Sequence, residues 1–238
     1  MARELNPKQL TGLDDAHLVI MPGGHRLQSE VAQAYAALSA DARDAGFELT
    51  IASAYRSFSR QLAIWNGKAG GTRPVYDDQG RLLSLACLSP SQQMHAILRF
   101  SAIPGTSRHH WGTDLDVYDA GAVSPEYELQ LSLAEVAPGG VFDALHCWLD
   151  ARMDEGKSYG FYRPYNEDRG GVAPERWHLS YAPLAVRCAE QVNAELLAAC
   201  WDCDDVTEAL LLRAAIERDW TDIVSRYVAV PGDWCPLS

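Results

Sequence analysis

The chain has 238 residues, 47% of them hydrophobic, and a formal net charge of −12 at pH 7. This length fits one large domain or a domain with a helical appendage, and the apolar content is sufficient for a core. The negative charge argues against nucleic acid or an anionic membrane as a partner, because both require basic patches. An anionic substrate must therefore be attracted by local cations.

The sequence gives a weak indication of compartment. The first residues contain no apolar leader, and no run elsewhere reaches the length of a membrane span. We therefore expect a cytoplasmic location, or a periplasmic one if a leader has been removed. Without a leader, the six cysteines are expected to be reduced thiols. Cys200 and Cys203 have redox-motif spacing, but they fall in a helical pattern, which disfavours a redox role.

The first hundred residues predict three helices and one strand. Apolar residues at helical spacing predict a helix over residues 27–45, and the alternating, β-branched residues 47–53 predict a strand. Ser57 is positioned to cap a second helix. Residues 66–88 are rich in Gly and Asp and predict a loop beside a cleft. Pro90, after Ser89, is typical of the first position of a third helix.

The second half mixes short strands with helices. Strands are predicted at residues 115–118, weakly at 127–133, and at 159–162 and 177–181, with a helix over 141–153 and a mobile loop over 165–173. Residues 184–201 and 206–227 predict two C-terminal helices joined by an acidic turn. We expect an α+β core over residues 1–183, with residues 184–238 as a C-terminal helical extension packed on it.

Two segments carry residues suited to a metal centre. His109 and Asp116 lie seven residues apart, where a loop leads into a predicted strand, and His178 lies in a later strand. Imidazole and carboxylate are zinc ligands, and three protein ligands leave a fourth position for water, as in catalytic zinc sites. Glu175, three residues before His178, is a candidate to accept a proton from that water.

The same segments match the motifs of a known family. The matches are Ser107, His109, Gly112 and Asp116 to Ser-x-His-x-x-Gly-x-x-x-Asp, Glu175, Trp177 and His178 to Glu-x-Trp-His, and residues 53–57 with Gln61 to a Ser-Gly-Tyr-Arg-Ser segment. The chain therefore resembles the zinc D-alanyl-D-alanine carboxypeptidases and D,D-dipeptidases that trim bacterial cell-wall peptides. The resemblance covers about half of the chain, with the three motifs in the family's order.

The resemblance implies a fold, a cofactor and a substrate. The fold is a small antiparallel sheet flanked by helices, of the Hedgehog/D,D-peptidase type, and the cofactor is one zinc ion. The substrate is a peptide derived from peptidoglycan, with a C-terminal D-amino acid as the group removed. Arg56 is then expected in the substrate pocket, where arginine can bind an oxyanion or a terminal carboxylate. Ser107 and Gln61 are either peptide-binding or structural residues.

Several residues near the motifs have less certain roles. Asp114 stands where the family usually has a small residue, and it either orients a ligand histidine or faces solvent. Arg176 stands where proline is common. His110 is expected to pack or support the site rather than bind metal. The remaining histidines are read as structural: His17, His25, His95 and His146.

Other activities are compatible with the same residues. The centre could serve an L,D-carboxypeptidase or an endopeptidase acting on the same class of substrate. The fold also exists as a non-catalytic zinc-holding module, but a pure binder requires neither Glu175 nor Arg56. The sequence leaves the oligomeric state open.

Overall fold

A four-stranded antiparallel sheet forms the centre of the computed structural model, which describes residues 4–229. Its strand order is β3-β4-β6-β5. The strands are β3 (Leu49–Ser53), β4 (Asp114–Asp119), β5 (Phe161–Tyr162) and β6 (His178–Tyr181), and a separate hairpin pairs β1 (Val19–Ile20) with β2 (Arg26–Leu27). The predicted α+β class, with a small antiparallel sheet flanked by helices, is confirmed.

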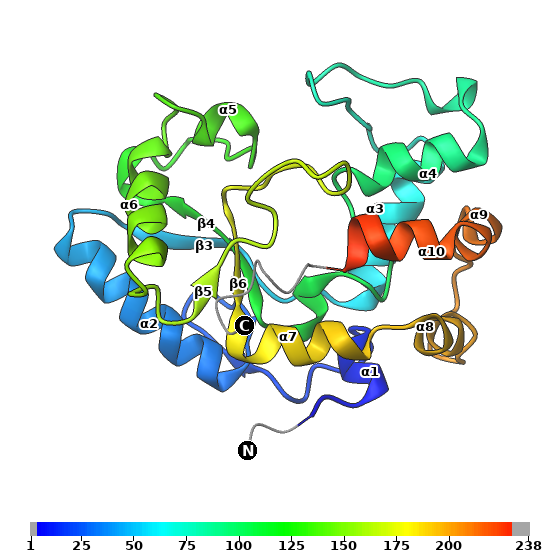
Figure 1. Cartoon of the computed structure of the whole chain (residues 1–238), viewed down its shortest axis with the longest axis horizontal. Helices are drawn as coiled ribbons and strands as arrows, with labels where there is room; N and C mark the ends of the chain where they lie inside the picture. Colours follow the sequence, from blue (N-terminus) through cyan, green and yellow to red (C-terminus); the bar gives the residue numbers. More distant parts are fainter. Residues whose placement is uncertain (1–3, 230–238) are drawn as a thin grey trace.

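The helices lie around this sheet (Figure 1). They are α1 (Pro7–Leu10), α2 (Ser29–Asp44), α3 (Phe58–Ala69), α4 (Pro90–Leu98), α5 (Leu133–Val136), α6 (Asp143–Asp154), α7 (Ala182–Gln191), α8 (Ala194–Trp201), α9 (Arg213–Arg218) and α10 (Trp220–Ile223). Short 3-10 turns cover Leu85–Cys87, Arg108–Trp111 and Ala120–Ala122, and a π-helical segment covers Val224–Val228.

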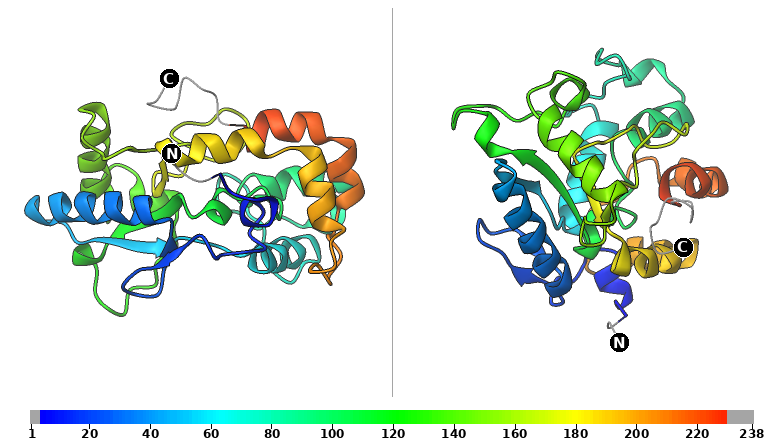
Figure 2. Two further views of the ribbon diagram at one scale, coloured as in Figure 1. Left: turned by 90° about the horizontal axis from the view of Figure 1, so that it is seen from below. Right: turned by 60° about the vertical axis from the view of Figure 1, so that its left-hand side comes forward.

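The two largest hydrophobic clusters lie at different ends of the fold (Figure 1). The first joins the sheet to α2 and α6 and includes Leu27, Val31, Leu38, Leu115, Val117, Leu145, Leu149, Phe161 and Leu179. The second joins α3 and α4 to α8, α9 and α10 and includes Phe58, Leu62, Trp65, Met94, Ile97, Leu98, Leu197, Trp201, Ile216 and Ile223. Figures 1 and 2 show these helix groups at opposite ends of the molecule. The C-terminal helices thus share a core with α3 and α4, and the domain boundary at residue 183 stays a prediction.

Side-chain caps explain where α3 and α4 begin. The Ser57 side chain accepts a hydrogen bond from the Arg60 N–H at the start of α3. Ser89 and Gln92 form a reciprocal capping box at α4, with Pro90 in the first turn. The observed bounds of α2, α3, α4 and α6 agree with the sequence-based predictions to within a few residues, so these predictions are confirmed.

The two long C-terminal helices were predicted wrongly, because each is interrupted. Val192 is extended, and the Asn193 side chain caps a new helix by accepting from the Leu196 N–H. Leu212 has a left-handed φ of 64°, and helices α9, α10 and the π-helical segment follow it in place of one helix. Helical periodicity continued through these breaks, whereas Asn193 was a readable signal that a new helix begins after it.

The strand predicted at residues 127–133 is also wrong. The segment folds around the buried carboxylate of Glu135 instead of pairing with the sheet. That carboxylate accepts from the Tyr127 hydroxyl at 2.8 Å and from the backbone N–H groups of Gln130 and Ser132 at 3.0 and 2.8 Å. A carboxylate that satisfies the backbone locally removes the need for a strand partner.

Two further sequence features can be placed. The described cysteines are free thiols at positions 87, 147, 188, 200 and 203, whereas Cys235 lies outside the described residues. Over residues 4–229, none of the helices combines the length and the apolar character that a bilayer crossing requires.

Candidate metal centre

The register of the central strands brings two of the predicted ligands together. Asp116 on β4 is paired directly with His178 on β6. Directly opposed residues of an antiparallel pair project from the same face, with Cβ atoms about 5 Å apart. Asp114 lies two residues before Asp116 and therefore shares this face.

His109 reaches the same face from the 3-10 turn that precedes β4. Gly112 ends this turn with a left-handed φ of 68°. The left-handed backbone conformation favours glycine, and a Cβ at this position would also displace the Leu18 side chain, whose Cδ2 would lie 2.3 Å away. The Gly of the motif therefore supports the turn that delivers His109.

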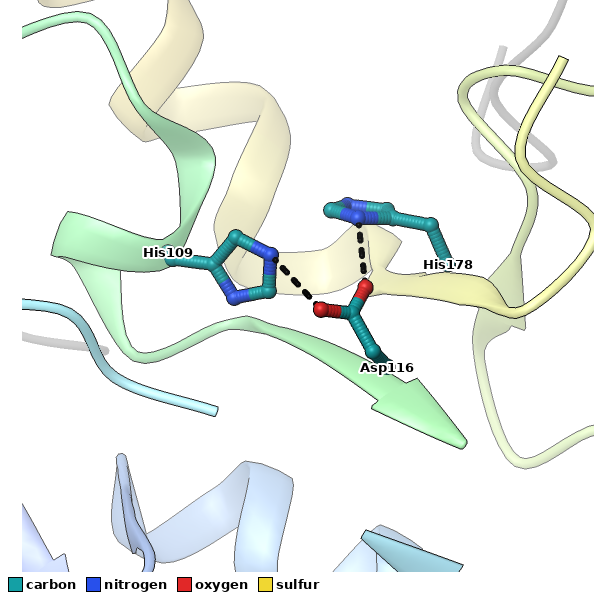
Figure 3. A group of neighbouring side chains, drawn as sticks. All are labelled: His109, Asp116 and His178. Atoms are coloured by element: carbon teal, nitrogen blue, oxygen red, sulfur yellow. Dashed lines mark hydrogen bonds and ion pairs between the residues drawn. The ribbon is translucent and has the colours of Figure 1, made fainter. Parts of the chain in front are cut away.

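The three predicted ligands converge (Figure 3). Asp116 presents one oxygen to each imidazole: Oδ1 is 3.1 Å from Nδ1 of His178, and Oδ2 is 3.4 Å from Nε2 of His109. One ligand atom from each residue lies within 4.8 Å of the others, and all three residues are buried. The side chains from two distant segments thus form one group that could hold a metal ion.

In each histidine, the ring nitrogen that points away from the ligand group faces a hydrogen-bond acceptor. Nδ1 of His109 is 2.8 Å from the carbonyl oxygen of Ala54, which only accepts, so this nitrogen carries the proton and Nε2 faces the centre. Nε2 of His178 is 2.9 Å from Oδ1 of Asp114, which leaves Nδ1 facing the centre. Metal-binding histidines are commonly oriented in this way.

Asp114 is buried and bonded, which resolves the choice between supporting and solvent-facing roles. Its Oδ1 accepts from Nε of Arg108 at 2.8 Å as well as contacting His178. Arg108 donates further to the Ser180 and Tyr162 hydroxyls at 2.6 and 3.0 Å. Asp114, the first departure from the family pattern, therefore forms a buried ion pair with Arg108 and contacts the predicted ligand His178.

Removing the Asp114 carboxylate is expected to destabilise the protein strongly. Asp114→Ala leaves the buried Arg108 guanidinium without its counterion, which costs about 3–5 kcal/mol of unfolding free energy. Denaturant unfolding of the zinc-free protein measures this cost. The double variant Asp114→Ala with Arg108→Met is expected to recover most of the loss. Equal instability of the single and double variants would show that the pair is not the cause.

His110 does not face the centre. Its Nδ1 lies 2.6 Å from the Arg56 carbonyl oxygen, and its Nε2 accepts from the Gly105 N–H at 3.1 Å. Burial lowers its pKa to about 3, so the ring is neutral. Both nitrogens are used in holding the loop, as expected for a structural histidine.

Glu175 lies beside the ligand group. Its Oε2 is 3.6 Å from Nδ1 of His178, and 17% of its side chain is exposed. Burial raises the pKa of this carboxyl to about 7, with Asp116 adding to the rise and His178 opposing it. A carboxyl with such a pKa exchanges a proton near neutral pH.

Arg176 does not pair with Glu175. Its guanidinium donates to Oδ1 of Asp143 and Oδ2 of Asp150, each at 2.7 Å, and to the Val136 carbonyl oxygen at 2.8 Å. Arg176, the second departure from the family pattern, therefore connects the segment that contains Glu175 to helix α6.

A cavity of about 830 Å³ opens onto this group. Its wall includes the three predicted ligands together with Arg56, Ser107 and Glu175. Residues 76–80, from the loop predicted beside a cleft, also line it. Lys68 and Tyr165 line it as well, but α3 continues to Ala69, so Lys68 is helical where the loop was predicted.

Gln61 lies behind Arg56 rather than on the cavity wall. It is fully buried, its Oε1 accepts from Nη1 of Arg56 at 3.0 Å, and its Nε2 donates to the Ala102 carbonyl oxygen at 2.7 Å. The Ser53 hydroxyl lies 3.4 Å from Nη2 of Arg56. The structure thus gives Gln61 contacts that orient the arginine.

Comparison with known proteins identifies the family. A family model described as D-alanyl-D-alanine carboxypeptidase (VanY) matches residues 24–184. The chain belongs to this carboxypeptidase family. The resemblance of the three motifs and the assignment as a metallopeptidase of this type are thereby confirmed.

Two proteins of known sequence match parts of the chain. Two uncharacterized proteins of Haemophilus influenzae are 44% identical over 104 residues and 30% identical over 124 residues. The first match covers 42% of this chain and 71% of the relative, and the second covers 51% and 92%.

Solved structures share the fold. VanYB in complex with D-alanine-D-alanine is 22% identical, with a TM-score of 0.50 over 73% of this chain and 81% of that chain. A mutant of the vancomycin-resistance D,D-pentapeptidase VanY in complex with Zn(II) is 23% identical, with a TM-score of 0.50 over 77% and 90%.

Proposed function

We propose that the protein is a zinc-dependent carboxypeptidase that removes C-terminal D-alanine from peptidoglycan stem peptides. The observation that carries this proposal is the convergence of His109, Asp116 and His178 within 4.8 Å at the wall of a cavity that Glu175 and Arg56 also line. The family description, D-alanyl-D-alanine carboxypeptidase, supports the choice of substrate.

The donor set fits zinc. Two imidazoles and one carboxylate are common zinc ligands, and three protein ligands leave a position for solvent or substrate. The second nitrogen of each histidine is already held by an acceptor, as in zinc sites. A bound zinc ion would supply Lewis acidity toward water and the peptide carbonyl.

The remaining chemistry belongs to two side chains. The Glu175 carboxylate accepts a proton from the attacking water and returns it to the leaving amine, for which its pKa of about 7 is suited. Arg56, held by Gln61, donates to the oxygen that becomes negative as the peptide carbonyl is attacked, or to the terminal carboxylate. Arg56 is largely removed from water, which lowers the pKa of its guanidinium. The low dielectric constant of such a site also strengthens the attraction between this guanidinium and an anion.

Side-by-side peptide assays test the proposal. Zinc-loaded protein is incubated with a stem pentapeptide ending in D-Ala-D-Ala, a tetrapeptide ending in an L,D bond, and a cross-linked peptide. We expect kcat/KM for D-alanine release from the pentapeptide to exceed the other two by at least about tenfold, because substrate positioning selects one bond. Preferential tetrapeptide or internal cleavage would establish the L,D-carboxypeptidase or endopeptidase alternative, and no cleavage would favour the binding module.

The predicted cytoplasmic location bears on the natural substrate. If it holds, the substrates are soluble stem peptides released from the wall, whereas a periplasmic protein would have access to the wall itself.

A further inference from the structure

Lys68, in the last turn of α3, places a cation on the wall of the metal cavity in addition to Arg56 and the paired Arg108. Its Nζ donates to the Ser101 hydroxyl oxygen at 2.7 Å, and that hydroxyl donates in turn to the Phe100 carbonyl oxygen at 2.7 Å. Ser101 therefore acts only as an acceptor for the lysine. An ammonium group has three N–H donors, so two remain for a ligand.

In the described part of the chain, Lys68 and Arg56 lack carboxylate partners, unlike Arg108, which also lines the cavity and pairs with Asp114. Among residues 4–229, neither Lys68 nor Arg56 has a carboxylate oxygen within the 4.0 Å of an ion pair. The acidic residues of the facing loop are already paired, Asp77 with Arg81 and Asp78 with Arg99, both at 2.7 Å. A partly buried cation without a counterion is unfavourable unless an anion binds it.

The charges in the cavity act on one another. Lys68, Arg56 and Glu175 all line the same cavity. Burial lowers the pKa of Lys68, the Glu175 carboxylate raises it, and Arg73 and Arg56 lower it. A substrate carrying a negative charge would relieve the repulsion between the two cations.

Arg56 precedes α3, whereas Lys68 lies in the last turn of this helix. Gln61, which accepts from Arg56, is seven residues before Lys68 on the same helix face, so these two residues of α3 are about 10 Å apart along the axis. Arg56 is also tied to the ligand loop, because its backbone N–H donates to the His109 carbonyl oxygen at 3.1 Å. Arg56 therefore lies by the metal ligands, and Lys68 is displaced along the cavity wall.

We propose that Lys68 binds the free C-terminal carboxylate of the substrate, which leaves Arg56 to stabilise the carbonyl oxygen of the scissile bond. This inference rests on the proposed function and deepens it, because it identifies the residue that makes the cavity select peptide ends. An internal peptide bond offers Lys68 no carboxylate, so the arrangement favours a carboxypeptidase over an endopeptidase.

Peptide binding tests the role of Lys68 without relying on turnover. Calorimetry on zinc-loaded Glu175→Gln protein compares a stem peptide ending in free D-alanine with the same peptide ending in an amide. We expect the free acid to bind about tenfold to a hundredfold more tightly, as a charge-assisted hydrogen bond predicts. Lys68→Met in this background is expected to abolish the difference by weakening only the free acid, and Lys68→Arg should retain part of it.

Controls separate this inference from the proposed function. Lys157→Met, which removes an exposed lysine paired with Glu155, should leave both affinities unchanged. Thermal melting confirms that the Lys68 variants are folded. Persistence of the acid preference in folded Lys68→Met protein, or equal binding of acid and amide by the parent, overturns the role of Lys68. Absence of hydrolysis by the wild type would overturn the proposed function alone, since the acid preference is measured independently.

Discussion

Replacing Glu175 with glutamine is expected to lower kcat by about 10²–10⁴-fold while zinc remains bound. Glutamine has nearly the same shape but cannot accept a proton from water at neutral pH. The predicted ligand atoms belong to other residues, so metal content should not change. The measurement is kcat for D-alanine release together with the zinc content of the purified variant.

The pH profile checks the assignment of Glu175 as the base. Burial raises its pKa to about 7 without metal, and only the ionised carboxylate accepts a proton. Arg56 and Lys68 already oppose this rise, and the positive charge of a bound zinc ion would favour ionisation further, so kcat/KM should rise with pH and level off below about 7. The residual kcat/KM of the Glu175→Gln protein should not show this rise with pH.

A matched control comes from the same loop. Glu167 is exposed and paired with Arg169, and Glu167→Gln is expected to keep normal turnover and a normal pH profile. Normal turnover in Glu175→Gln protein would remove Glu175 from the mechanism.

The ligand group was predictable because its residue types are rare in combination. The motifs place one histidine and one aspartate at a turn–strand junction and a second histidine in a later strand. For the three side chains to meet, the two strands only had to be neighbours in the sheet. They are, because Asp116 on β4 is paired with His178 on β6. The position of Asp114 was also readable, since alternation along a strand places it on the face of Asp116.

Residues of α3 could not be assigned in the same way. Gln61 and Lys68 are ordinary helix residues, and helical spacing cannot tell a face toward a cavity from a face toward another side chain. The motif left Gln61 as either a peptide-binding or a structural residue, and its contacts are with Arg56 and Ala102. Only the tertiary packing of α3 against Ala102 and Ser101 reveals these roles.

Zinc uptake is expected to release about one proton from His178 near neutral pH. In the metal-free protein both ring nitrogens face carboxylates, Nδ1 at 3.1 Å from Asp116 and Nε2 at 2.9 Å from Asp114. Burial opposes the charged ring, but these hydrogen bonds raise the pKa of His178 to about 9. A metal ion needs the lone pair of Nδ1, so it must displace the proton. Zinc affinity should therefore increase about tenfold per pH unit between pH 7 and 9.

Calorimetry in buffers with different ionisation enthalpies measures the protons released. Asp114→Asn protein, studied below its own melting temperature, should release fewer, because it loses one of the two contacts that raise the pKa of His178. The same shift affects stability. The folded pKa lies above the usual value of 6.5, so this contribution is complete below pH 6.5 and is lost as pH rises through 9. The metal-free protein should therefore lose stability over this range, whereas the zinc-loaded protein should not. Zinc affinity that does not vary between pH 6.5 and 9 would show that His178 is already neutral and that the two aspartates do not hold it as a cation.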